Sequence, residues 1–179
     1  IFYAPLRMLG FPALTALYVT LACVTVLACT LSSCALSRIV SLSKLEAATI
    51  VYVSHFGLSI SGYLPHYQLF GFELAFPFFL YLFLYLRDWK LLDLVAVLFC
   101  FASGTCFATY LGPMLGCLGV IVALPFVWSE IKNSGVRGLL GKIGTSGALC
   151  VLLVSTLVYL IQIRPYIKAD RELETQSFS

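Results

Sequence analysis

Two ionisable residues stand inside long apolar stretches of this sequence, where a charged group is costly. His55 lies near the middle of one stretch, with Ser54 beside it and Ser59 one helical turn further along the same face. Glu73 lies about a turn and a half inside the next stretch. An imidazole and a carboxylate can exchange a proton, and an imidazole nitrogen can also bind haem iron. We therefore take His55 and Glu73 as candidates for substrate binding or proton handling, and His55 as the candidate for cofactor binding.

The sequence between these residues predicts that they meet. Pro65 and His66 are typical of a tight turn, and a chain folded back there brings Glu73 within about one turn of the depth of His55, at ~1.5 Å per helical residue. Two other arrangements stay open. His55 could bond a carbonyl or hydroxyl group on a neighbouring helix, and Glu73 could reach the membrane interface or a partner subunit.

The composition indicates the environment in which these apolar stretches are stable. Hydrophobic residues make up 61% of the 179 residues and charged residues 11%, against roughly 45–50% and 25% in soluble domains. The net charge is +3, and the basic residues are dispersed between apolar stretches. This pattern favours a membrane protein and argues against nucleic-acid binding.

We predict an all-α, polytopic membrane protein with about six transmembrane helices and short loops. Residues 1–163 form a single transmembrane domain, and residues 164–179 form a charged extramembrane tail. The predicted spans are 11–34, 47–63, 68–86, 91–111, 114–128 and 146–163. The span 114–128 is short for a crossing, which needs about 20 residues. Gly112-Pro113 is expected to break the chain before this span, and the polar segment 129–145 is expected to be a loop.

Six spans place three of the connecting loops on one side of the membrane. The basic residues of that side are Arg38, Lys44, Arg87, Lys90, Lys132, Arg137 and Lys142, and those of the other side are Arg7, Arg164, Lys168 and Arg171. Because cytoplasmic or matrix-like loops carry an excess of Lys and Arg, we expect the first group on that side and both termini across from it.

Three further features have structural interpretations. Gly112, Gly116 and Gly119 are spaced for close helix packing. Pro77 is expected to kink the third span. Charges of alternating sign surround Trp89 and predict a solvated cluster at the membrane interface.

The seven cysteines predict neither a metal site nor a disulfide framework. All lie in or beside apolar stretches, and no two form a C-x-x-C pair. We expect reduced thiols that act as small packing residues.

One short segment, residues 101–104, is similar to the serine motif of rhomboid intramembrane proteases. Both histidines precede Ser103, whereas those enzymes take their base from a later helix. The motif therefore does not predict proteolysis, and no complete catalytic motif is present.

Two other similarities concern cofactors and lipids. His55 followed by His66 and Tyr67 resembles the membrane anchor of succinate dehydrogenase, which implies haem b or quinone binding; that anchor has an Asp in place of His66 and three spans. Ser54-His55, residues 73–79 and residues 164–168 resemble, in order, elements of the sterol isomerase and sigma-2 receptor superfamily. These matches cover short segments and assign the chain to neither family.

The function expected from these observations is that of a non-catalytic integral subunit of a larger membrane complex. The apolar, aromatic-rich spans and the packing glycines favour contacts with lipid and with other subunits. The chain begins at Ile1, which is compatible with a removed transit peptide and with an organellar, energy-converting inner membrane such as the mitochondrial one. The alternatives are an enzyme or transporter that acts on a lipid, sterol or quinone through His55 and Glu73, and an anchor that binds haem b or quinone.

Overall fold

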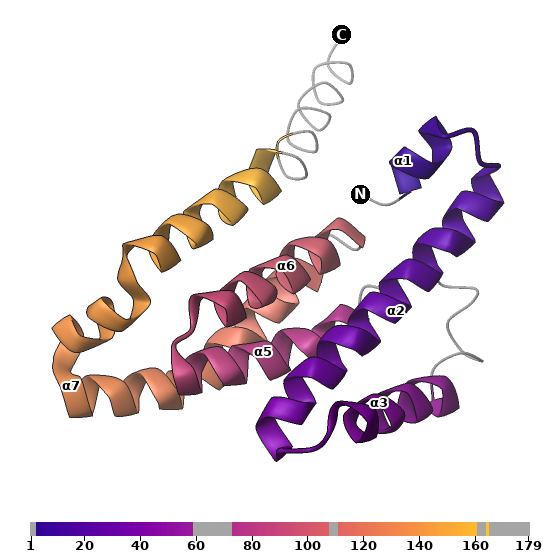
Figure 1. Cartoon of the computed structure of the whole chain (residues 1–179). Coiled ribbons are helices and arrows are strands. Elements are labelled where there is room, and N and C mark those ends of the chain that lie inside the picture. The colour runs from indigo at the N-terminus through magenta and orange to yellow at the C-terminus, as the bar shows by residue number, and fades with distance from the viewer. Residues whose placement is uncertain (1–2, 59–72, 108–110, 161–163, 165–179) are drawn as a thin grey trace, which may run out of the picture.

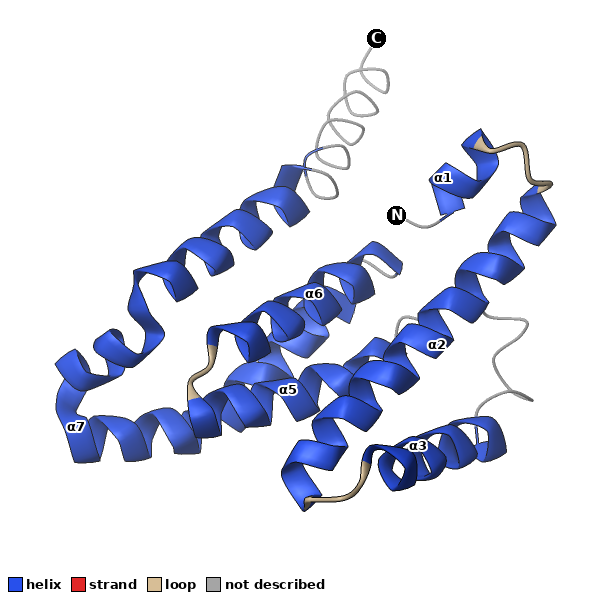
Figure 2. Cartoon of the chain, in the orientation of Figure 1, coloured by secondary structure: helices blue, strands red, loops and turns tan. Residues whose placement is uncertain are grey.

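The fold is entirely helical in the part of the chain that the computed structural model describes, residues 3–58, 73–107, 111–160 and 164 (Figure 2). The helices are α1 (Tyr3–Met8), α2 (Ala13–Val40), α3 (Lys44–Leu58), α5 (Ala75–Asp88), α6 (Leu91–Phe107) and α7 (Leu111–Val158). The all-α prediction is confirmed. The predicted turn at 64–67 and nearly all of the tail 164–179 lie outside the described residues.

Helix α2 is the long element against which the N-terminal half is arranged. Two of its buried hydroxyl side chains bond within the helix: Thr20 Oγ1 donates to the carbonyl of Ala16, and Ser33 Oγ donates to that of Cys29, each at 2.7 Å. The helix ends where Ser41 takes a left-handed conformation with φ 57°. An internally bonded hydroxyl costs little in an apolar environment, so α2 can be polar in composition at these positions and still be buried.

The other helices pack around α2 and α5. Helices α1, α3 and α5 contact α2, while α6 and α7 pack on α5 and on each other (Figure 1). The main hydrophobic core lies among α5, α6 and the start of α7, and Leu84, Cys100, Leu111 and Leu115 are fully buried there. The molecule is thus an α1–α3 unit joined through α2 to an α5–α7 unit.

The connections that the structure describes lie at the two ends of this bundle. The α2–α3 link, the α5–α6 link and the bend of α7 lie at one end, at the lower left of Figure 1. The α1–α2 link and the end of α7 lie at the opposite end. This arrangement positions the basic links at a common end.

Helix α7 differs from the prediction, because the segment 129–145 is not a loop. Most of the segment is helical, but the backbone is non-helical at Gly135 (φ 69°, ψ 173°) and Gly144 (φ 66°, ψ 168°), where the helix is interrupted and changes direction. Glycine reaches these positive φ values without the steric cost that other residues bear. A 2.7 Å ion pair between Lys142 and Glu130 links the two sides of the first bend. The polar composition of 129–145 therefore marks a bent, exposed part of a helix.

The positions of two prolines within their helices also differ from the prediction. Pro77 is in the first turn of α5, which begins at Ala75, and Pro113 is in the first turn of α7, which begins at Leu111. The first turn has no intrahelical acceptor for its N–H groups, so a proline there removes no hydrogen bond. The predicted kink at Pro77 and the predicted turn at 111–113 are both wrong: these prolines lie where helices start.

Two helical segments among the described residues are long and apolar enough to cross a membrane, Ala13–Val40 and Leu111–Thr145. The segments Leu91–Thr105 and Gly147–Val158 are apolar but shorter.

Candidate functional site

The structure brings His55 and Glu73 together. His55 is on α3, and Glu73 is in a short 3₁₀ turn directly before α5. The distance from His55 Nε2 to Glu73 Oε1 is 3.4 Å, and the two side chains are only 15% and 8% exposed. The proximity agrees with the expectation from the turn sequence between them. Helices α3 and α5 both pack against α2.

Thr25 of α2 completes this group. Its hydroxyl donates a 2.7 Å hydrogen bond to Glu73 Oε2, so both carboxylate oxygens have a polar neighbour. The sequence did not single out Thr25, because it is one of several hydroxyl residues on α2 and nothing local shows which of them faces Glu73. We call Thr25, His55 and Glu73 the Glu73 cluster.

A second polar contact lies one turn away along the same seam. Tyr52 precedes His55 by three residues on α3, and its hydroxyl is 3.4 Å from Thr30 Oγ1 of α2. Residues three apart share a helix face. The seam between α2 and α3 therefore carries polar groups at two successive levels.

The chemistry open to the Glu73 cluster is proton exchange and hydrogen bonding. A carboxylate and an imidazole within 3.4 Å can pass a proton between them, and the Thr25 hydroxyl holds the carboxylate in place. Haem ligation fits this arrangement poorly, because His55 Nε2 faces Glu73 Oε1. The second histidine, His66, lies outside the described residues.

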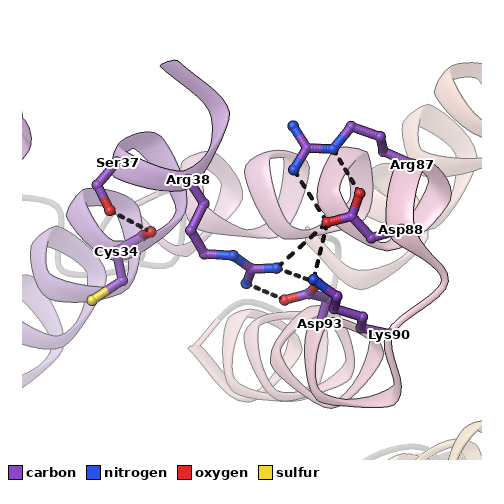
Figure 3. Close-up of polar contacts among 7 residues, drawn as sticks. All are labelled: Cys34, Ser37, Arg38, Arg87, Asp88, Lys90 and Asp93. Carbon is purple, nitrogen blue, oxygen red and sulfur yellow. Dashed lines mark hydrogen bonds and ion pairs between the residues drawn. The ribbon is translucent and has the colours of Figure 1, made fainter. Parts of the chain in front are cut away.

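A larger ionic group joins α2 to the α5–α6 corner (Figure 3). Both terminal nitrogens of the Arg38 guanidinium donate to Asp93, Nη1 to Oδ1 and Nη2 to Oδ2, the latter at 2.8 Å. The Asp93 side chain is 1% exposed, whereas Arg38 is 35% exposed. The predicted solvated cluster is therefore wrong for Asp93, whose carboxylate is buried under a bidentate arginine.

Asp88 is the more exposed of the two carboxylates in this group, at 22% against 1% for Asp93. Arg87 donates to it through Nε at 2.8 Å and Nη2 at 3.1 Å, and Lys90 Nζ lies 3.5 Å away. The hydrogen bonds from Arg87, and to a smaller extent the charges of Arg87 and Lys90, lower the pKa of Asp88 to about 2. This carboxylate stays ionised at any physiological pH and holds the cations around it.

The three packing glycines face helices of the same chain. A Cβ atom on Gly112 would lie 2.5 Å from Thr105 Oγ1, and one on Gly119 would lie 3.1 Å from Phe78 Cζ. Gly116 is less crowded, with Phe101 Cε2 at 3.8 Å. Their small size thus lets the start of α7 approach α5 and α6.

Six of the cysteines, Cys23, Cys29, Cys34, Cys100, Cys117 and Cys150, carry free thiols in the structure. Among the described residues, no three His, Cys, Asp or Glu side chains are grouped so that they could hold a metal ion.

The sequence matches no protein-family model, and no curated protein or solved structure is significantly similar to it.

Proposed function

We propose that this chain is a non-catalytic integral subunit of a larger membrane protein complex. The observation that carries the proposal is the outer limb of α7, residues 147–158. Three consecutive side chains there, Val151, Leu152 and Leu153, are 42%, 63% and 61% exposed. Consecutive residues point about 100° apart around a helix, so this limb is apolar on most of its sides. Such a helix requires lipid or partner helices around it.

The six-span topology is the finer part of this proposal. It is supported by the position of three described links at one end of the bundle (Figure 1) and by the excess of basic residues at that end. We place the complex in an organellar inner membrane of the energy-converting type, such as the mitochondrial one. The small, helix-only form of the described chain fits a subunit that fills space and binds lipid between larger subunits.

Purification in mild detergent tests the proposal. The tagged chain is expected to migrate in native electrophoresis with a fixed set of partner subunits. Leu152→Lys, which charges the outer limb, should release these partners. Val136→Lys is the matched control, because Val136 is 58% exposed and lies at the basic bend. A monodisperse single chain without partners would overturn the proposal.

A second candidate function uses the Glu73 cluster to handle a proton on a lipid, sterol or quinone. The specific observation in its favour is the contact of one shielded carboxylate with both an imidazole and a hydroxyl. Mass spectrometry of an organic extract of the purified protein tests it. A quinone or sterol should be present in wild type and lost in His55→Ala, but retained in Thr49→Ala, which changes an exposed hydroxyl of the same helix. An extract without such a molecule would reject this function.

A further inference from the structure

Three cations lie near Trp89, in sequence or in space, at the α5–α6 corner. Arg87 and Lys90 flank Trp89 in the sequence, and Lys142 from the bend of α7 places its Nζ 6.0 Å from the centre of the Trp89 ring. The three basic side chains are 41%, 63% and 42% exposed. We call these three cations and Trp89 the Trp89 rim.

The rim has more donor capacity than its carboxylates use. Arg87 and Lys90 share the single carboxylate of Asp88 with Arg38, and Lys142 bonds Glu130. Arg38 is already committed to buried Asp93. An ammonium has three donors and a guanidinium has five, so several exposed N–H groups remain for an anion. Phosphate oxygens suit both side chains, and arginine can bind them through two parallel hydrogen bonds.

Apolar side chains lie directly beside these donors. Leu91 and Leu92 follow Lys90 and are 43% and 77% exposed. Trp89 is itself an amphipathic side chain of the kind found at membrane interfaces. A free phosphate ion or a soluble phosphorylated molecule would leave Leu91 and Leu92 uncovered, whereas a phospholipid supplies a phosphate and, next to it, an acyl chain.

We propose that the Trp89 rim binds the headgroup of an anionic phospholipid. This inference rests on the proposed membrane location, and it adds a ligand class and named residues to it. The rim lies at the end with the three basic links, which topology assigns to the leaflet that carries anionic lipids. Asp88 and Glu130 orient the cations, and the lipid phosphate takes the donors that point outward.

Tryptophan quenching by brominated lipids tests this proposal. The chain has two tryptophans, so Trp128→Phe leaves Trp89 as the single reporter. The protein is reconstituted in phosphatidylcholine, and brominated phosphatidylglycerol or brominated phosphatidylcholine is then titrated in. Quenching of Trp89 should show a clear preference for phosphatidylglycerol.

Two variants distinguish binding at the Trp89 rim from general electrostatic attraction of anionic lipids to the protein. Lys90→Gln should reduce the preference about fivefold, the usual contribution of one cation near an anionic surface. Lys44→Gln is the matched control, since Lys44 is an exposed cation at the start of α3 and does not belong to the rim. Equal losses in both variants would overturn the proposal, because they would indicate general attraction.

Three other outcomes of the quenching experiment would each contradict a specific proposal. Equal quenching by the two lipids would overturn the rim proposal and leave the membrane proposal intact. Absence of quenching by either lipid would instead contradict the membrane location of this corner. If inorganic phosphate removed the preference, when sodium chloride of the same ionic strength did not, the rim would be a phosphate-ion site and the lipid proposal would fail.

Discussion

At the scale of single residues, the two acidic side chains that are less than 10% exposed in the described ion pairs each have a partner from another element. Glu73 meets Thr25 and His55, and Asp93 meets Arg38. A carboxylate in an apolar environment loses its hydration, and these contacts replace part of it. The two groups therefore fasten α2 to the helices around it at two different levels.

The Glu73 cluster should behave as a coupled unit. His55→Ala should destabilise the protein by about 1–2 kcal/mol, because Glu73 loses a polar neighbour, and adding Glu73→Gln should recover part of that loss. The free energy of unfolding in a double-mutant cycle should show a coupling of at least about 0.6 kcal/mol. The control cycle pairs Glu73→Gln with Thr49→Ala and should be additive. Additive effects for His55 and Glu73 would show that they are neighbours without interaction.

The Arg38–Asp93 pair predicts a larger effect. Arg38→Ala leaves the buried Asp93 carboxylate without its guanidinium and should cost about 3 kcal/mol, the low end of the range for buried pairs because Arg38 itself is 35% exposed. Replacing both residues, with Arg38→Met and Asp93→Leu, should restore most of the stability. Chemical unfolding measures both, with the exposed Arg137→Ala as a near-neutral control. A double variant as unstable as the single one would contradict this account.

Asp88 makes the stability of the folded protein depend on pH in the acidic range. Its pKa lies at about 2 in the folded protein, below the ordinary value of 3.8. A lowered folded-state pKa means that the stabilisation is complete above about pH 4 and is lost as the pH falls towards about 2. The difference in unfolding temperature between wild type and Asp88→Asn should therefore be present at about pH 6 and shrink at about pH 2. A difference that stays constant with pH would refute it.

The sequence predicted part of these contacts. The proximity of His55 and Glu73 followed from the turn that Pro65 and His66 predict between two neighbouring segments. Thr25 and the Arg38–Asp93 pair did not, because they depend on how α2 is rotated against α5 and α6. That rotation is fixed by packing between residues about 50 positions apart, for which the local pattern carries no signal.

At the scale of elements, the close approach of α7 to α6 depends on Gly112. A side chain there would collide with Thr105, whose Oγ1 is 2.5 Å from the position of an added Cβ. Gly112→Ala should cost about 1–3 kcal/mol, and Thr105→Ala should recover part of it by removing the colliding atoms. Gly141→Ala is the control, since nothing lies within 4 Å of its added Cβ. Thermal unfolding in detergent measures these effects, and equal stability of Gly112→Ala and Gly141→Ala would contradict the packing argument.

The helices themselves were predictable, and their ends were less so. Long uncharged stretches predict helices because a backbone in lipid must satisfy its own hydrogen bonds. The same reasoning treated Pro77, Pro113 and the polar residues 129–145 as breaks. Prolines in the first turn of a helix interrupt nothing, and Gly135 and Gly144 interrupt α7 only locally. Composition alone does not distinguish these cases from a loop.

At the scale of the whole molecule, the six-span topology predicts on which side of the membrane each link lies. In a chain whose native cysteines are replaced, single cysteines at Met8, Ser41 and Ser134 report on the α1–α2 link, the α2–α3 link and the bend of α7. All three positions are exposed.

The basic residues near Ser41 and Ser134 predict that both lie on the cytoplasmic or matrix-like side, with Met8 across the membrane. A membrane-impermeant maleimide added from that side should therefore label Ser41→Cys and Ser134→Cys and leave Met8→Cys unlabelled until the membrane is opened. A further cysteine at Gln176, outside the described residues, should behave like Met8→Cys. Labelling of all four from one side would end the six-span topology, because α2 alone would then fail to cross the bilayer despite its 28 residues.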